Sequence, residues 1–245
     1  MELLISPSEY KKSKMIICKG LNDLMKRFVH KRLVGNYYLI NMFELDKRIR
    51  MLAKYIVKYN VLIVNRNKLF FPYLERAKEY LNVLLGRFLP GSFTNPNSPN
   101  FLEPDAVLVF NVKLDKQAIR EALKVNIPIF GLCSLNDDPT YLDFILPINN
   151  KNRKSISTFI WLLIREIKLI KGEIKSYKEF PGIQEFYKKV TTKTKYFYII
   201  LKEKYYFYER KRTSSFRVFN DIWMGNINSN SSYWSFVCYR NVKTL

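Results

Sequence analysis

Residues 106–130 read AVLVFNVKLDKQAIREALKVNIPIF, and this stretch decides the fold class. Its two ends are short apolar runs typical of buried strands, whereas Ala118, Ile119 and Ala122 in its middle follow a helical spacing. Asp115 is placed to cap that helix. A strand, a helix and a strand in this order predict one βα unit of a parallel sheet.

The same alternation extends outward over residues 36–172. Short β-branched or aromatic runs alternate there with longer segments of helical period, as in repeated βα units. We therefore predict a single parallel sheet covered by helices. Its candidate strands are Tyr37–Met42, Val61–Val64, Val83–Leu85, Ala106–Phe110, Ile127–Phe130 and Phe144–Leu146.

Two further segments carry helical signals. Between the first two candidate strands, one helical face is apolar, whereas another is basic. This helix should bury one side and present a basic stripe on the other. The apolar positions are Leu45, Ile49, Leu52, Ala53 and Ile56, and the basic positions are Lys47, Arg50, Lys54 and Lys58. Pro72 fits the first turn of a second helix, which should pack through Leu74, Ala77 and Leu81.

The alternation is interrupted at two places. Arg87–Glu103 is rich in proline and asparagine, which favours a long loop, and loops of this length are usually functional or disordered. From about residue 186 onward, lysine, tyrosine, phenylalanine and serine mix without a clean period. We therefore predict an N-terminal segment at 1–35, an α/β domain at 36–185 and a basic, aromatic C-terminal extension at 186–245. The tyrosines of this extension either stack on bases or pack as a hairpin.

The composition points to a polyanionic partner. Lys and Arg number 42 against 21 Asp and Glu, so the formal charge is +21 and the pI is about 9.8. Nucleic acid is the first candidate for that partner. An anionic membrane would match the same charge, but the longest apolar run, Phe159–Ile164, is far too short to span a bilayer. We expect it to be a buried helix and expect no membrane association.

The termini and cysteines add two exclusions. The first residues, MELLIS, lack a basic start and a long apolar segment, so no secretory signal is expected and a cytoplasmic location is favoured. Cys18, Cys133 and Cys238 are far apart and odd in number. They match neither a disulfide framework nor a zinc site, and we expect them to be reduced apolar residues.

Enzyme signatures are weak. No two glycines stand in a G-x-G arrangement, which a dinucleotide site would need. Gly86 and Gly91 have the spacing of a phosphate-binding loop, but Ser92 and Phe93 replace its lysine and hydroxyl residue. His30 has no catalytic neighbour in sequence, and Asp137-Asp138 before Pro139 is typical of a solvated turn. We expect no catalytic residue, no metal and no cofactor.

Basic residues give the stronger signal. Residues 149–155, NNKNRKS, lie between the last strand and a helix, where amides and cations can meet phosphates. A merely solvated loop is the alternative, but a position at the carboxyl end of a strand favours binding. Other positive residues are scattered, as phosphate contacts on a large RNA would be. They are Lys31, Arg32, Arg48, Arg50, Arg66 and Arg87.

Several long motifs stand in a distinctive order and spacing, namely Gly86–Pro96, Glu103–Asp105, Asp115–Ile119, Pro147–Ser155 and Trp161–Glu166. Together they resemble the archaeal and eukaryotic branch of the small ribosomal subunit protein S2 family, also called the laminin-receptor-precursor family. The similarity covers about residues 36–180, with a weaker match over residues 3–10. The sequence departs from the family at residues 14–20 and in its long basic tail.

The resemblance implies a flavodoxin-like three-layer sandwich with a central parallel sheet, docked on small-subunit ribosomal RNA beside other ribosomal proteins. It implies a structural constituent of the ribosome and no catalysis. Arg87, Thr94, Asn95, Lys151, Arg153 and Lys154 match family positions and are expected to contact RNA or neighbouring proteins. Together with Arg48, Arg50 and Arg66 they form our predicted RNA-binding set.

Other functions remain open on the sequence. A nucleotide- or sugar-binding enzyme on the same fold is the main alternative, since fold does not determine function. A cell-surface or cytoskeletal interaction module is another, although no secretion signal supports it. The ribosome that we expect to contain the chain is cytoplasmic, with an endosymbiont-derived compartment as the alternative.

Overall fold

The computed structural model describes residues 3–183. The predicted extension, residues 186–245, and Cys238 lie outside them. The described chain begins with helix α1 (Pro7–Lys12) and a small antiparallel sheet of β1 (Ile17–Lys19), β2 (Val29–Arg32) and β3 (Tyr37–Ile40), in the order β1-β3-β2. A short 3-10 helix, η1 (Asp23–Phe28), leads into β2. The expected boundary between residues 35 and 36 falls inside the β2–β3 hairpin.

This small sheet corrects one prediction. Tyr37–Met42 was expected to open the parallel sheet, but Leu39 pairs with Ile17 in the antiparallel sheet. The run also ends early, because the Asn41 side chain accepts a hydrogen bond from the Phe43 amide and starts a helix at Met42. Apolar alternation predicts a strand but does not reveal its partner.

The central sheet has five parallel strands in the order β5-β4-β6-β7-β8. The other five predicted strands are confirmed within a few residues. The largest shift concerns Ile127–Phe130, because Pro128 has no N–H to donate and the strand begins after it. The strand bounds are β4 Val61–Asn65, β5 Asn82–Leu85, β6 Ala106–Val109, β7 Ile129–Cys133 and β8 Phe144–Pro147.

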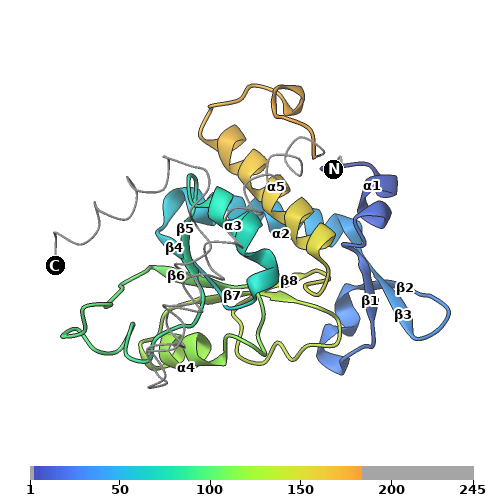
Figure 1. Cartoon of the computed structure of the whole chain (residues 1–245). Coiled ribbons are helices and arrows are strands. Elements are labelled where there is room, and N and C mark those ends of the chain that lie inside the picture. The colour runs from blue at the N-terminus through green and yellow to red at the C-terminus, as the bar shows by residue number, and fades with distance from the viewer. Residues whose placement is uncertain (1–2, 184–245) are drawn as a thin grey trace, which may run out of the picture. The chain divides into compact units, whose positions relative to one another are not determined.

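Helices cover both faces of this sheet. Figure 1 shows α2 (Met42–Lys58), α3 (Phe71–Ala77) and α5 (Arg153–Ile170) on one face and α4 (Lys116–Lys124) on the other. Two 3-10 helices complete the described chain, η2 (Lys68–Phe70) and η3 (Tyr177–Glu179). The chain thus has the flavodoxin-like three-layer α/β fold that was predicted.

Helix α5 is the most deeply buried helix of residues 3–183. Every residue from Ser155 to Ile167 is buried, so the expectation of a buried helix at Phe159–Ile164 is confirmed. The Phe159 ring meets the ring of Phe110 edge-on, with centroids 6.0 Å apart, and joins α5 to the end of β6. Within the described residues, no helix has the length and apolar character needed to cross a bilayer.

A buried polar cluster joins the N-terminal segment to this helix layer. The Asp46 carboxylate on α2 accepts hydrogen bonds from the Leu4 amide, at 2.8 Å, and from the Tyr10 hydroxyl. The Arg165 guanidinium on α5 donates to the Leu4 carbonyl at 2.9 Å. Burial, followed by the nearby Asp46 charge, raises the pKa of Tyr10. Residues 3–13 are therefore held to the domain by specific polar contacts.

Candidate nucleic-acid interface

The basic loop, residues 149–154, connects β8 to α5, and its asparagines hold it in place. The Asn149 side chain donates to the carbonyls of Lys14 and Ile17, at 3.1 and 2.8 Å, and its backbone amide donates to the Met15 carbonyl at 3.0 Å. The loop is thereby attached to the N-terminal segment.

A second asparagine attaches the loop to the sheet. The Asn150 side chain donates to the Leu132 carbonyl and to the Asp137 carboxylate, both at 3.1 Å. Asp137 also accepts from the Ser134 amide and lies 3.1 Å from the Lys113 ammonium. The prediction of a solvated turn at Asp137-Asp138 is therefore wrong for Asp137, which is buried, and right for Asp138, which is exposed.

The third asparagine starts the helix. The Asn152 side chain accepts a hydrogen bond from the Lys154 amide at 3.2 Å, which is an N-cap of α5. Lys151, which lies between Asn150 and Asn152, is exposed, and so are Arg153 and Lys154 in the first turn of α5. The loop therefore holds three cations on a rigid backbone at the carboxyl edge of the sheet. These anchors were not predicted from the sequence, although a side-chain amide before a helix is a known capping signal.

The loop at Arg87–Glu103 is irregular, as predicted, and a buried carboxylate organises it. Glu121 on α4 accepts hydrogen bonds from the backbone amides of Gly91 and Phe93, at 2.9 and 3.2 Å. These amides lie in the segment that resembles a phosphate-binding loop, and Glu121 occupies them with negative charge. No sequence signal marked Glu121, since it lies in mid-helix. The predicted residues Arg87, Thr94 and Asn95 are all exposed.

The crevice between β4 and β6 is where a fold of this kind usually places a ligand, because the strand order reverses there. Here the Asp115 carboxylate lies at that point and accepts a hydrogen bond from the Arg66 amide at 3.0 Å. It makes no capping bond to α4, contrary to our expectation. A buried acidic group at this position opposes phosphate binding. The Arg66 side chain is exposed.

Burial raises the pKa of Asp115 from 3.8 to about 7, which predicts a pH effect on stability. The folded state binds this proton more tightly than the unfolded state, so the free energy of unfolding should fall as pH rises from 3.8 to about 7. Asp115→Asn should remove this contribution. The free energy of unfolding of the variant should therefore rise, relative to that of the parent protein, by at most about 1.4 kcal/mol for each unit that the pH increases within that window.

Urea unfolding at several pH values measures this effect. Asp138→Asn is the matched control, because Asp138 is an exposed carboxylate. A constant difference between Asp115→Asn and the parent across the window would contradict the assignment of this titration to Asp115.

Helix α2 presents its predicted basic stripe in part. Lys47, Lys54 and Lys58 are exposed, whereas Arg50 is half-buried. Arg48 is engaged within the protein. Its guanidinium donates to Glu44 and to the Ile145 carbonyl, both at 2.8 Å, and lies over aromatic rings. Arg48 and Arg50 remain predicted RNA contacts, but the structure gives Arg48 an internal role as well.

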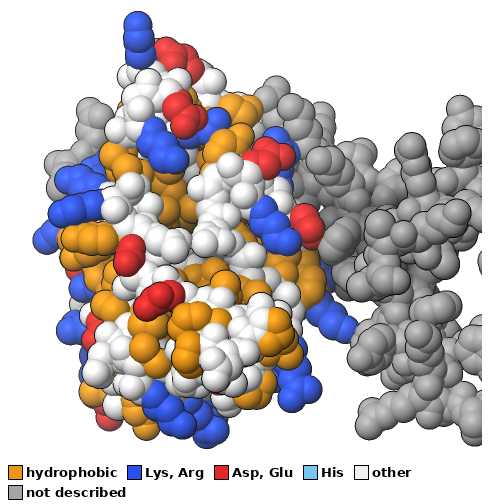
Figure 2. All heavy atoms as spheres, turned by 90° about the vertical axis from the view of Figure 1, so that its left-hand side faces the viewer, with side chains coloured by type: hydrophobic (Ala, Val, Ile, Leu, Met, Phe, Trp, Pro, Cys, Tyr) orange, Lys and Arg blue, Asp and Glu red, His pale blue; other side chains and the backbone are white. Residues whose placement is uncertain are grey.

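The predicted cationic residues fall into three groups. Lys151, Arg153 and Lys154 lie together, Arg66 and Arg87 follow the adjacent strands β4 and β5, and Arg48 and Arg50 lie on α2. Figure 2 shows one face on which Lys and Arg side chains lie around the margin and mostly uncharged side chains occupy the middle. Positive charge is thus dispersed over this face, with Asp and Glu side chains among it, and does not gather in one patch.

The two cysteines within residues 3–183, Cys18 and Cys133, are buried and free. Burial raises the pKa of both thiols, so they are poor nucleophiles. His30 is exposed on β2. The burial of Cys18 and Cys133 agrees with their interpretation as reduced apolar residues.

Comparison with known proteins gives one consistent result. The family model described as Ribosomal protein S2 matches residues 95–169, which include the basic loop and most of α5. The chain is 35% identical over 185 residues to the small ribosomal subunit protein uS2 of Picrophilus torridus, covering 73% of this chain and 92% of that protein. It is 33% identical over 176 residues to the uS2 protein of Methanococcus maripaludis, covering 70% and 80%. For the uS2 protein of Aeropyrum pernix, the identity is 32% over 203 residues, covering 76% and 97%.

Proposed function

The chain belongs to the ribosomal protein S2 family, and from this premise we propose that it binds ribosomal RNA and neighbouring proteins as a structural constituent of the small ribosomal subunit. Its relatives carry the name of a small-subunit protein, so its place is in the ribosome and its process is translation. Membership also implies a structural role and not a catalytic one.

The geometry of the basic loop is the observation that carries the RNA-binding proposal. Asn149, Asn150 and Asn152 each hold the backbone through hydrogen bonds, so the backbone that carries Lys151, Arg153 and Lys154 is held at a defined position. A backbone that is already ordered loses little conformational entropy when the cations it carries neutralise phosphates, although the long side chains still lose rotamer freedom. RNA shape, more than base identity, would then decide where the protein docks.

Two carboxylates count against the alternative of a nucleotide-binding enzyme. Glu121 already occupies the amides of the loop after β5, and Asp115 lies at the crevice between β4 and β6. Both groups are buried; Glu121 already accepts hydrogen bonds from the amides that would hold a phosphate, and Asp115 would repel a phosphate in its ionised form. The exposed Thr94 and Asn95 are then better placed for contacts with RNA or with a neighbouring ribosomal protein.

Sedimentation of a cell lysate through a sucrose gradient tests this proposal. At moderate salt the chain should comigrate with the small subunit and its RNA. Persistence at the top of the gradient would overturn the structural role and would reopen the enzyme alternative.

Removing the three cations of the basic loop should weaken RNA binding in a salt-dependent way. For the variant Lys151→Ala, Arg153→Ala and Lys154→Ala, the slope of log affinity against log salt should decrease by about 0.9 or less for each lost phosphate contact. The slope is obtained from titrations of small-subunit RNA at several salt concentrations.

The matched control removes three cations from α4, by Lys116→Ala, Arg120→Ala and Lys124→Ala. These side chains are exposed at helical spacing and lie on the opposite face of the sheet from α5. Equal slopes for the parent and the basic-loop variant would mean that the loop is merely solvated.

A further inference from the structure

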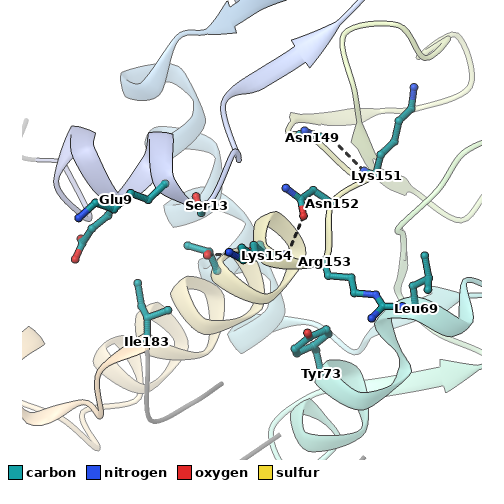
Figure 3. A pocket seen from close by; sticks show the side chains of 12 residues that line it. Glu9, Ser13, Leu69, Tyr73, Asn149, Lys151, Asn152, Arg153, Lys154 and Ile183 are labelled. Carbon is teal, nitrogen blue, oxygen red and sulfur yellow. Dashed lines mark hydrogen bonds between the residues drawn. The ribbon is translucent and has the colours of Figure 1, made fainter. Parts of the chain in front are cut away.

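A pocket of about 1000 Å³ lies beside the basic loop. Helix α1 provides one wall, the start of α5 provides another, and η2 and α3 provide a third. Figure 3 shows Arg153 extending toward Leu69, with Tyr73 nearby, while Glu9 and Ser13 lie across the pocket on the α1 side. Three segments far apart in the sequence therefore enclose one cavity.

The charged side chains of this pocket favour an anion. Four of the described residues that line it are cationic, namely Lys12, Lys151, Arg153 and Lys154, whereas Glu9 is acidic. All four cations are exposed to solvent, so a ligand can reach them. A phosphate is the anion that such a cluster recognises in nucleic acid.

The remaining surface of the pocket favours a flat apolar group. Leu69, Tyr73 and Ile183 line it, next to the side chains of Asn149, Asn152 and Thr158, which already form hydrogen bonds with the backbone of the protein. An aromatic ring next to cations is the usual platform for a base and its phosphate. The cavity is also within the volume range of small-molecule sites, which is about 300–1000 Å³.

We propose that this pocket binds an unpaired nucleotide of ribosomal RNA, with its phosphate at the cations and its base against Tyr73. The inference rests on the proposed function and specifies the form of RNA recognised. A base inside a duplex is stacked on both faces and paired along one edge, so it cannot enter a cavity. The pocket therefore distinguishes extruded nucleotides from helical RNA, which the exposed cations alone would not do.

The test compares two RNA probes against the full chain. One is a short unstructured RNA, and the other is the same sequence annealed to its complement. Tyr73→Leu removes the aromatic ring and should weaken binding of the single-stranded probe by roughly tenfold while leaving the duplex affinity unchanged. Tyr73→Phe, which keeps the aromatic ring, should bind the single-stranded probe as tightly as the parent protein does. Tyr141→Leu is the matched control, because Tyr141 is an exposed tyrosine that does not line this pocket.

Each outcome separates this inference from the proposed function. Equal affinities of Tyr73→Leu and the parent for the single-stranded probe would overturn the nucleotide site while leaving RNA binding intact. Loss of a ribosomal protein from subunits that carry Tyr73→Leu, with RNA affinities unchanged, would assign the pocket to a peptide and also overturn it. If Tyr73→Leu fails to fold, ultraviolet crosslinking of the parent to the single-stranded probe decides, since the site requires crosslinks to the peptide that contains Tyr73.

Discussion

Replacing Phe159 with alanine should lower the free energy of unfolding by about 3–5 kcal/mol, because the change leaves a cavity between the sheet and its helix layer. Phe159 is fully buried in the middle of α5 and meets Phe110 at the carboxyl end of β6. Neighbouring α5 residues are buried on every side, so the backbone has little freedom to collapse into the space. Urea unfolding monitored by circular dichroism measures the loss.

The matched control is Phe43→Ala on α2. Phe43 is 58% exposed, so the same truncation should change stability by about 0.5 kcal/mol or less. Similar losses for the two variants would contradict the placement of Phe159 in the core.

Replacing Asp46 with alanine should lower the free energy of unfolding by about 3–5 kcal/mol, because the change leaves buried hydrogen-bond donors without their acceptor. The Leu4 amide and the Tyr10 hydroxyl would both lose a hydrogen bond, and the nearby Arg165 guanidinium would lose a compensating negative charge. Asp46→Asn keeps the shape but offers one acceptor oxygen where there were two, so its loss should be smaller.

Asp23→Ala is the control for this change. Asp23 forms an ion pair with Lys26 on the surface, and exposed pairs contribute little. Limited proteolysis adds a structural readout, since Asp46→Ala should expose residues 3–13 to cleavage. Resistance of this segment together with unchanged stability would show that the cluster does not hold it.

This cluster also supports the interface. The basic loop is anchored on carbonyls at Lys14 and Ile17, and helix α1 forms one wall of the pocket. A released N-terminal segment should therefore weaken RNA binding through the loss of an ordered loop, even though Asp46 is buried away from any RNA.

The sequence by itself determined the fold class and the central βα units. Val61–Val64 and Ala106–Val109 are apolar throughout, and a buried parallel strand requires that pattern locally. The local sequence likewise predicted α5, the Pro- and Asn-rich loop, and the exposed cations around the start of α5. Each of these features is encoded within one short window of residues.

Only the tertiary structure decided which distant residues contact one another. Tyr37–Ile40 pairs in an antiparallel sheet, and the buried Asp137 accepts a hydrogen bond from Asn150. Glu121 accepts hydrogen bonds from the amides of Gly91 and Phe93. These contacts join residues that are distant in sequence, and the local pattern around each residue is compatible with several partners. Hydrogen bonds between distant groups form where packing brings donor and acceptor together, so the chain's folding, and not its local spacing, selects them.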